Sequence, residues 1–198
     1  MIKANNLSKS FNGNRIFSGI NLTVKKSTIL GVVGNNGSGK TTLLKIVAGI
    51  INSDTGNINL NANIKLDFLG HENMLYQNFS ISENIDFFSD ISGFRISSEL
   101  QDEIEKALGL QNILGKKISD LSYGQRKKAS MLRSLISSPD LLVLDEPFSN
   151  LDSESTDSFI SILKTLKKEN KSVIISSNRK DVVGLVSDDL LNMDDYNE

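Results

Sequence analysis

The stretch Thr28-Ile-Leu-Gly-Val-Val-Gly-Asn-Asn-Gly-Ser-Gly-Lys-Thr41 decides the fold. Residues 28–33 form a short apolar run rich in β-branched side chains, which predicts a buried strand. Residues 34–41 fit the phosphate-loop pattern Gly-x-x-x-x-Gly-Lys-Thr, and residues 41–50 have the pattern of a helix. Strand, glycine-rich loop and helix in this order predict an α/β domain of the P-loop NTPase class.

The glycine-rich loop predicts a site for a nucleoside triphosphate. Glycines let the backbone wrap closely enough for its N–H groups to face phosphate oxygens, and the following helix adds its positive end. We expect Lys40 to reach the β- and γ-phosphates and the Thr41 hydroxyl to ligate Mg²⁺. The alternative, a glycine-rich turn before a chance Lys-Thr pair, is disfavoured by the strand–loop–helix context. The expected nucleotide-binding residues of this segment are Gly34, Asn35, Asn36, Gly37, Ser38, Gly39, Lys40, Thr41 and Thr42.

A second buried strand is expected at residues 141–144, and it runs into two carboxylates, Asp145 and Glu146, before Pro147. A strand next to the phosphate loop delivers its C-terminal residue into the nucleotide site, where Asp145 would hold Mg²⁺ through water. Glu146 would then point to the position of an attacking water and is the candidate general base. The alternative is a surface turn after a core strand, which the sequence Asp-Glu-Pro would also suit.

Composition limits the chemistry further. The 198 residues are 38% apolar and 23% charged, so we expect one soluble domain over residues 1–198. The absence of cysteine excludes disulfides and thiolate metal sites, and a single histidine, His71, excludes multi-histidine metal sites. No apolar run approaches the roughly 18 residues that cross a bilayer, and a net charge of −2 predicts no nucleic-acid partner.

The remaining segments divide into a core and a helical part. Two N-terminal strands flank a turn at residues 12–14, and residues 58–60 and 64–69 predict a hairpin or two edge strands. We expect the core at about residues 1–71 and 137–198 and a helical subdomain at about residues 72–136. The acid-rich tail, residues 187–198, is expected to be a solvated end after a last short strand. Capping-box spacing predicts helix starts at Ser80-Ile-Ser-Glu83, Ser98-Glu-Leu-Gln101 and Ser122-Tyr-Gly-Gln125.

The pentapeptide Leu121-Ser122-Tyr123-Gly124-Gln125 lies shortly before the acidic strand end. A serine cap, a glycine and the free N–H groups of a helix start make an anion site. This pentapeptide resembles the signature motif of the ATP-binding cassette (ABC) ATPases, usually Leu-Ser-Gly-Gly-Gln; the alternative is a plain capping box. The resemblance implies an ATPase that works as a head-to-tail homodimer, in which each signature closes the γ-phosphate held by the other chain.

The same resemblance assigns further residues. Phe11 lies where the family stacks an aromatic ring on adenine, although a core phenylalanine is the alternative. Ser149-Asn150-Leu151-Asp152 is similar to the family's dimer-contact loop. The implied fold is a RecA-like core with a small antiparallel β subdomain and a helical subdomain that receives a transmembrane permease subunit. The chain is then expected to be cytoplasmic and peripheral on the membrane, which it contacts only through that partner.

Two positions depart from the family pattern. A glutamine usually ends the strand before the helical part, but here Phe68-Leu69-Gly70 leads to His71. Together with Ser80-Ile-Ser-Glu-Asn84, this stretch is similar to the haem-exporter ATPases of cytochrome c maturation (CcmA type); the alternative is a histidine that merely ends a strand. Asn178 occupies the place of the family's switch histidine. Asparagine can donate a hydrogen bond but cannot carry charge or relay a proton, so we expect slow turnover.

Other interpretations stay open. The chain could serve another ABC exporter, of lipid, polysaccharide or a drug, or it could be a soluble ABC ATPase without a membrane partner. Residues 178–181, Asn-Arg-Lys-Asp, come within one residue of the Asn-Lys-x-Asp pattern with which many GTPases read guanine. No GTPase explains the signature-like pentapeptide together with Asp-Glu-Pro, so guanine specificity is disfavoured.

Overall fold

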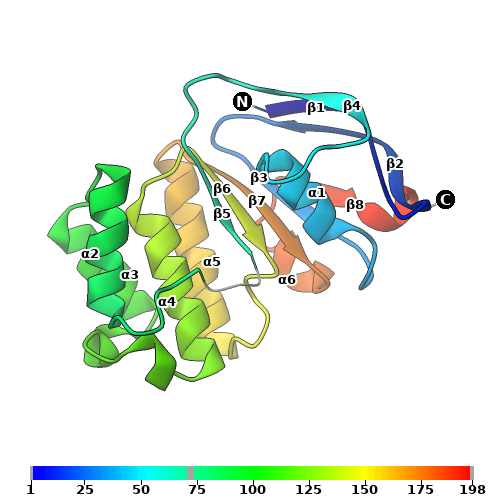
Figure 1. Cartoon of the computed structure of the whole chain (residues 1–198). Coiled ribbons are helices and arrows are strands. Elements are labelled where there is room, and N and C mark those ends of the chain that lie inside the picture. The colour runs from blue at the N-terminus through cyan, green and yellow to red at the C-terminus, as the bar shows by residue number, and fades with distance from the viewer. Residues whose placement is uncertain (1, 71–73, 197–198) are drawn as a thin grey trace.

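The computed structural model describes residues 2–70 and 74–196. A five-stranded parallel sheet in the order β5-β6-β7-β3-β8 forms the centre, and a three-stranded antiparallel sheet in the order β2-β1-β4 lies beside it (Figure 1). The parallel strands are β3 (Ile29–Val33), β5 (Leu66–Leu69), β6 (Leu141–Asp145), β7 (Ser172–Ser177) and β8 (Asp189–Asn192). The antiparallel strands are β1 (Ile2–Phe11), β2 (Asn14–Val24) and β4 (Thr55–Leu60).

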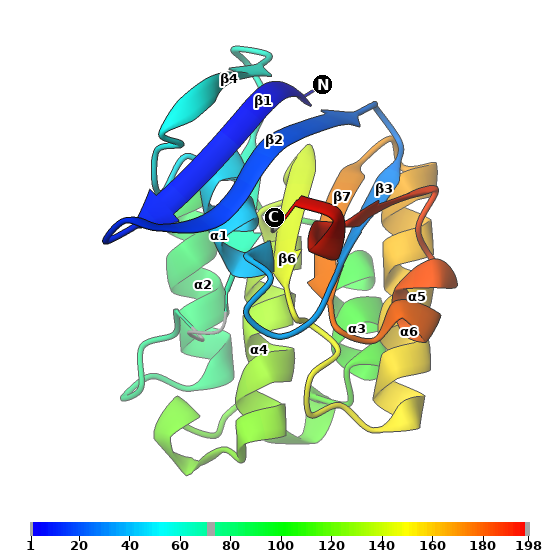
Figure 2. The same cartoon turned by 90° about the vertical axis from the view of Figure 1, so that its right-hand side faces the viewer.

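Helices cover both faces of the parallel sheet. Helix α1 lies between this sheet and the antiparallel sheet, as Figure 2 shows, and the other α-helices lie on the opposite face. The helices are α1 (Lys40–Val47), α2 (Ile81–Ser92), α3 (Ser98–Ala107), α4 (Tyr123–Ile136), α5 (Ser153–Lys168) and α6 (Lys180–Gly184). The short 3-10 helices of the described residues are η1 (Gln111–Ile113), η2 (Ile118–Asp120) and η3 (Met193–Tyr196).

Successive residues of the central strands point to opposite faces and therefore feed two hydrophobic clusters. On β6, Leu142 and Leu144 belong to the cluster with α2 to α6, whereas Leu141 and Val143 pack with α1 and the antiparallel sheet. All residues of β6 are buried. A strand covered on both faces needs apolar side chains on both, which is why residues 141–144 read as a continuous apolar run.

The arrangement confirms the predicted α/β fold, with its parallel core sheet, small antiparallel sheet and helical part. Segments 58–60 and 64–69 lie in edge strands of different sheets and do not form a hairpin. β4 pairs antiparallel with β1, and β5 pairs parallel with β6. Among the described residues, no helix is both long and apolar enough to cross a bilayer.

Two of the three expected capping boxes are confirmed, at the starts of α2 and α4. The third is wrong by one residue, because Ser97 rather than Ser98 caps α3 and accepts the N–H of Leu100. Gln101, expected to complete that box, donates to Glu105 instead. Two adjacent serines precede this helix, and either is a favourable cap, so the pattern alone does not choose between them.

The last short strand expected in the C-terminal tail is confirmed as β8, and the acids Asp188, Asp189 and Asp195 are exposed, but the solvated end expected after the strand is wrong for Met193. β8 adds to the parallel sheet beside β3, and the next residue, Met193, is fully buried. Asp188 accepts the N–H of Ile29 at 2.9 Å and forms an ion pair with Lys167. Asp188 therefore binds the start of β3 and the end of α5.

Lys127, on α4, is a cation in the core. Its side chain is fully buried, and its ammonium has no hydrogen-bond partner within the described part of the chain. Burial lowers the pKa of Lys127, an effect that the negative charges of Asp145 and Glu146 partly oppose. A buried charge without a hydrogen bond is destabilising, so this side chain reduces the stability of the fold.

We expect Lys127→Met to raise the free energy of unfolding of the nucleotide-free protein by about 1 kcal/mol at pH 7, because methionine fills similar space without charge. Since the folded chain holds the proton less tightly than the unfolded chain, wild-type stability should rise with pH as it approaches the ordinary lysine pKa. The gain should therefore shrink toward about pH 10. Urea unfolding across this range, with the part-exposed neighbour Lys128→Met as control, measures the effect; a less stable Lys127→Met protein at pH 7 contradicts it.

Candidate functional site

The phosphate loop follows β3 and opens onto a cavity at the carboxyl ends of the parallel strands, where ligands of such sheets bind. The cavity has a volume of about 410 Å³. Its walls come from the loop, α1, the hairpin of β1 and β2, and the ends of β6 and β7. The lining residues are Ile16, Asn36, Gly37, Gly39, Lys40, Thr41, Thr42, Glu146, Ser149 and Asn178.

Lys40 lies inside the loop, and its ammonium binds two consecutive backbone carbonyls. Its Nζ donates to the carbonyls of Gly34 and Asn35, each at 2.9 Å. The Glu146 carboxylate lies 3.7 Å away, and both side chains are largely buried. The ammonium is therefore held at the cavity by two backbone carbonyls and by an ion pair with Glu146.

Two glycines allow the loop this shape. Gly39 caps α1 at φ +89°, and a Cβ there would lie 2.7 Å from Ile16. Gly34 has φ +152°, and a Cβ there would lie 2.6 Å from the Ser38 hydroxyl. Any other residue at these positions would combine backbone strain with a steric clash.

Asp145, at the end of β6, is a fully buried carboxylate. Its Oδ2 accepts the Thr41 hydroxyl at 2.8 Å, and its Oδ1 accepts the Ser176 hydroxyl at 2.7 Å. A carboxylate and a hydroxyl oxygen side by side suit Mg²⁺, which binds through one or two carboxylates together with water and nucleotide phosphates. Within residues 2–70 and 74–196, no group of three acidic or histidine side chains could hold a metal alone. These residues therefore fit an ion that arrives with a nucleotide.

Glu146 follows at φ +48°, a left-handed conformation that is uncommon for glutamate. Its N–H donates to the Ser176 hydroxyl at 3.0 Å and to the Ser176 carbonyl at 3.2 Å. Its carbonyl accepts the hydroxyl of Ser149 at 2.8 Å. These bonds hold a strained backbone whose side chain lines the cavity, and such strain is concentrated at functional sites.

Ser176 is a site residue that the sequence reasoning missed. It lies directly opposite Asp145 in the register of β6 and β7, which brings its hydroxyl to both acidic residues. Ile16 of β2, which also lines the cavity, was missed as well. Phe11 lies at the end of β1, 46% exposed, with the Lys9 ammonium 5.2 Å from its ring centre, and does not line the cavity.

Three more of the residues predicted to act at the site are Asn178, Asn35 and His71. Asn178 lines the cavity. Asn35 turns its N–H and its side-chain amide away from the cavity, to the carboxylate of Asp194. His71 lies outside the described residues.

The signature-like pentapeptide lies away from the cavity of its own chain: of its residues, all of them described, none lines it. Ser122 and Gln125 form the capping box of α4, Tyr123 is 43% exposed, and Leu121 is buried. A Cβ on Gly124 would lie 3.6 Å from the carbonyl of Asn150. The pentapeptide and the loop at residues 149–152 are therefore neighbours.

The loop at residues 149–152 links the cavity to α5. Ser149 lines the cavity, Asn150 has φ +60°, and Asp152 caps α5 by accepting the N–H of Ser155 at 2.7 Å. That hydrogen bond holds the pKa of Asp152 below its usual value. Leu151 packs partly buried against the core.

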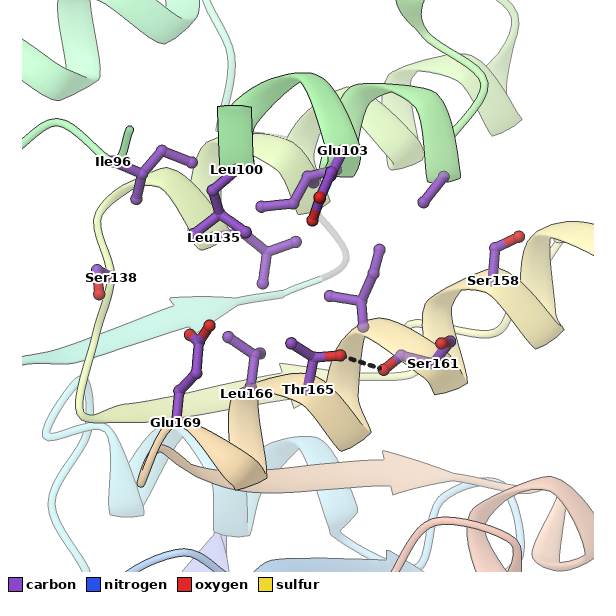
Figure 3. Close-up of a pocket in the computed structure, with 13 residues that line it drawn as sticks. Ile96, Leu100, Glu103, Leu135, Ser138, Ser158, Ser161, Thr165, Leu166 and Glu169 are labelled. Carbon is purple, nitrogen blue, oxygen red and sulfur yellow. Dashed lines mark hydrogen bonds between the residues drawn. The ribbon is translucent and has the colours of Figure 1, made fainter. Parts of the chain in front are cut away.

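A second cavity, of about 300 Å³, lies between α3, α4 and α5 (Figure 3). Leu100, Leu135 and Leu166 supply apolar walls, and the carboxylates of Glu103 and Glu169 also line it. Thr165 turns its hydroxyl back to the carbonyl of Ser161 within α5. Of the described motif residues, none lines this cavity, so it is separate from the phosphate loop.

Comparisons with known proteins agree with the site. A family model described as ABC transporter matches residues 17–149. An uncharacterized ABC transporter ATP-binding protein of Methanocaldococcus jannaschii is 34% identical over 96% of this chain and 72% of its own length. The zinc import ATP-binding protein ZnuC of Wolbachia pipientis is 34% identical, over 90% of this chain and 73% of its own. The lipoprotein-releasing system ATP-binding protein LolD of Wigglesworthia glossinidia brevipalpis is 30% identical, over 88% and 86%.

Solved structures share the fold. A structure titled as the ATP-binding subunit of an ABC transporter superposes with a TM-score of 0.86 at 17% identity, covering 97% of this chain and 85% of that one. A dimeric ATP-binding cassette bound to ADP and phosphate gives 0.83 at 20% identity, covering 97% and 94%. The chain belongs to the ABC transporter family and is one of its ATP-binding, ATP-hydrolysing subunits.

Proposed function

We propose that this chain drives a membrane transporter by closing as a homodimer on two molecules of Mg-ATP and opening after hydrolysis. The hydrogen bond between Thr41 and Asp145 carries the proposal, because it joins the phosphate loop to the acidic strand end at one point. Lys40, Thr41, Thr42 and the amides of the loop would hold the phosphates. Residues 1–198 would act as one cassette, with a helical subdomain at about residues 72–136.

Asp145 and Glu146 would have different roles in the reaction. Asp145 and Thr41 would hold Mg²⁺, which neutralises charge on the phosphates. Glu146 would orient water and accept its proton, since it lines the cavity beside Lys40. Asn178 would donate a hydrogen bond to the γ-phosphate and, lacking charge, would slow turnover. His71 would sense the ion and the water in the place of the usual glutamine.

The signature, residues 121–125, would act on the nucleotide of the other chain. Its position outside its own cavity supports this, because the free N–H groups at the start of α4 then have a phosphate to bind only across an interface. Ser122 and Gly124 would supply those contacts, and the loop at residues 149–152 would lie at the same interface. The exposed ring of Phe11 would stack on adenine beyond the phosphate cavity.

A face rich in aromatic side chains supports a membrane partner. Tyr76, Phe79, Phe87 and Phe88 lie just before or within α2, with the Tyr76 and Phe87 ring centres 4.8 Å apart. Tyr76 is 49% exposed and Phe79 is 39% exposed. Exposed aromatic clusters are typical of protein interfaces. We name Tyr76, Phe79, Phe87 and Phe88 the aromatic face and propose that it receives a cytoplasmic part of a transmembrane permease.

The cargo is proposed from the residues around His71 alone. Phe68-Leu69-Gly70-His71 and residues 80–84 favour haem export for cytochrome c maturation. Export of lipid, polysaccharide or a drug is the alternative, and relatives named for zinc import and lipoprotein release do not favour either. In each case the chain would be cytoplasmic, held on the membrane only through its partner.

Glu146→Gln should lower the ATPase rate about 10²- to 10⁴-fold while ATP binding stays within a few-fold of wild type, because only the proton acceptor is lost. Steady-state phosphate release and calorimetric ATP binding measure the two quantities. Glu99→Gln, an exposed acid on α3, is the matched control and should leave both unchanged. A Glu146→Gln protein with wild-type ATPase activity would show that another group accepts the proton.

Asn178→His should hydrolyse ATP faster than wild type in the same assay, because histidine, unlike asparagine, can carry charge and relay a proton.

A tagged chain should co-purify with a polytopic membrane protein from mild-detergent extracts of its own cells, and Tyr76→Ser with Phe79→Ser should abolish that capture. Loss of aromatic area removes the contact, whereas the phosphate loop and ATP binding should be unaffected. Leu185→Ser, which changes a still more exposed apolar residue at the end of α6, is the control. Cytochrome-maturation proteins beside the permease would support haem export. Soluble partners alone, in wild type and control, would overturn the transporter proposal in favour of a soluble ABC ATPase.

A further inference from the structure

The C-terminal segment reaches the phosphate loop because of the register of the parallel sheet. β3 leads into the loop, β8 lies beside β3, and Val33 is directly opposite Asn192. Parallel neighbours end at the same edge of a sheet. The residues that follow β8 therefore meet the first residues of the phosphate loop.

The contact is close and buried. Met193 is fully buried in the cluster beneath the loop. A Cβ on Gly34 would lie 3.1 Å from the Cβ of Met193 and 3.2 Å from Oδ1 of Asp194. Helix η3 therefore packs directly against the first glycine of the loop.

Asp194 binds both donors of Asn35. Its Oδ1 accepts the backbone N–H at 3.0 Å, and its Oδ2 accepts the side-chain amide at 3.1 Å. Hydrogen bonds to an ionised acceptor are stronger than those between neutral groups, and a pair of them also fixes orientation. The backbone of Asn35 is thereby held away from the cavity.

One peptide unit is held from both sides. The N–H of Asn35 and the carbonyl of Gly34 belong to the same planar peptide and point in opposite directions. Asp194 accepts that N–H, while the ammonium of Lys40 donates to that carbonyl at 2.9 Å. Turning the peptide would break both contacts, so the orientation of Lys40 depends on the contact made by Asp194.

We propose that Asp194 is a positioning residue of the ATP site, which acts through Asn35 to hold the loop and Lys40 in the shape that binds triphosphate. The proposal rests on the proposed role of the loop in ATP binding. The negative charge of Asp194 by itself would weaken the binding of a phosphate to the nearby loop. The contribution of Asp194 to ATP binding therefore comes from its two hydrogen bonds, which fix the shape of the loop. The neutral Asp194→Asn should therefore retain the function, because Asn35 can rotate its amide to pair with the new one.

The test compares adjacent acids. Asp194→Ala should raise the KM for ATP about tenfold and weaken calorimetric ATP binding equally, with kcat within about twofold, because two hydrogen bonds to the loop are lost before ATP binds. Asp195→Ala, whose carboxylate bonds only to Asn192 among the described residues, should match wild type. Asp194→Asn should restore the wild-type KM. Asn35→Ala should weaken binding less, and adding it to Asp194→Ala should cause little further loss.

The possible failures can be separated. If wild type itself neither binds nor hydrolyses ATP, the proposed function fails. If wild type is active and Asp194→Ala has the KM of Asp195→Ala, only the role of Asp194 fails. If Asp194→Ala does not fold, the proposal rests on Asp194→Asn and Asn35→Ala. It is overturned if Asp194→Asn weakens ATP binding about tenfold relative to wild type. It is also overturned if Asn35→Ala binds ATP as tightly as wild type.

Discussion

The hydrogen bond from Thr41 to Asp145 is the contact on which the site depends. It joins the first turn of α1 to the end of β6, and the same buried carboxylate also accepts Ser176 of β7. The carboxylate of Asp145 therefore links α1, β6 and β7. Without that carboxylate, two hydroxyls would lose their acceptor in a closed place, which is costly, and the acidic strand end would no longer be fixed to the phosphate loop.

The geometry of Glu146 follows from the same contact. Because Ser176 donates to Asp145 and accepts the N–H of Glu146, one serine sets the positions of both acidic residues. The left-handed backbone of Glu146 is held by that N–H and by Ser149. In the proposed mechanism, the general base is thus placed by the residues that fix the ion site, and the two cannot move independently.

The parts of the site that could be predicted from the sequence are those whose residues follow one another in a short continuous motif. The phosphate loop, the strand that ends in Asp145 and Glu146, and the capping box of α4 each lie within one short segment, so local pattern was sufficient. Ser176, Ile16 and Asp194 reach the site through strand register instead. Ser176 is one of three serines in β7, and only its pairing opposite Asp145 selects it. Asp194 lies in an acidic tail whose composition predicted solvation, and only the pairing of β8 with β3 brings it to the loop.

In the proposed mechanism ATP is held between two chains, so two inactive variants should restore activity to each other when they are mixed. Lys40→Met removes the phosphate contact, and Ser122→Asp keeps the helix cap while repelling phosphate. Each variant alone should lack ATPase activity. Co-refolded in equal amounts, they should recover about a quarter of the wild-type rate, since half of the dimers are mixed and each mixed dimer holds one intact site of two. A mixture no more active than the separate variants would contradict the account, because it would place the signature and the phosphate loop of one site on the same chain.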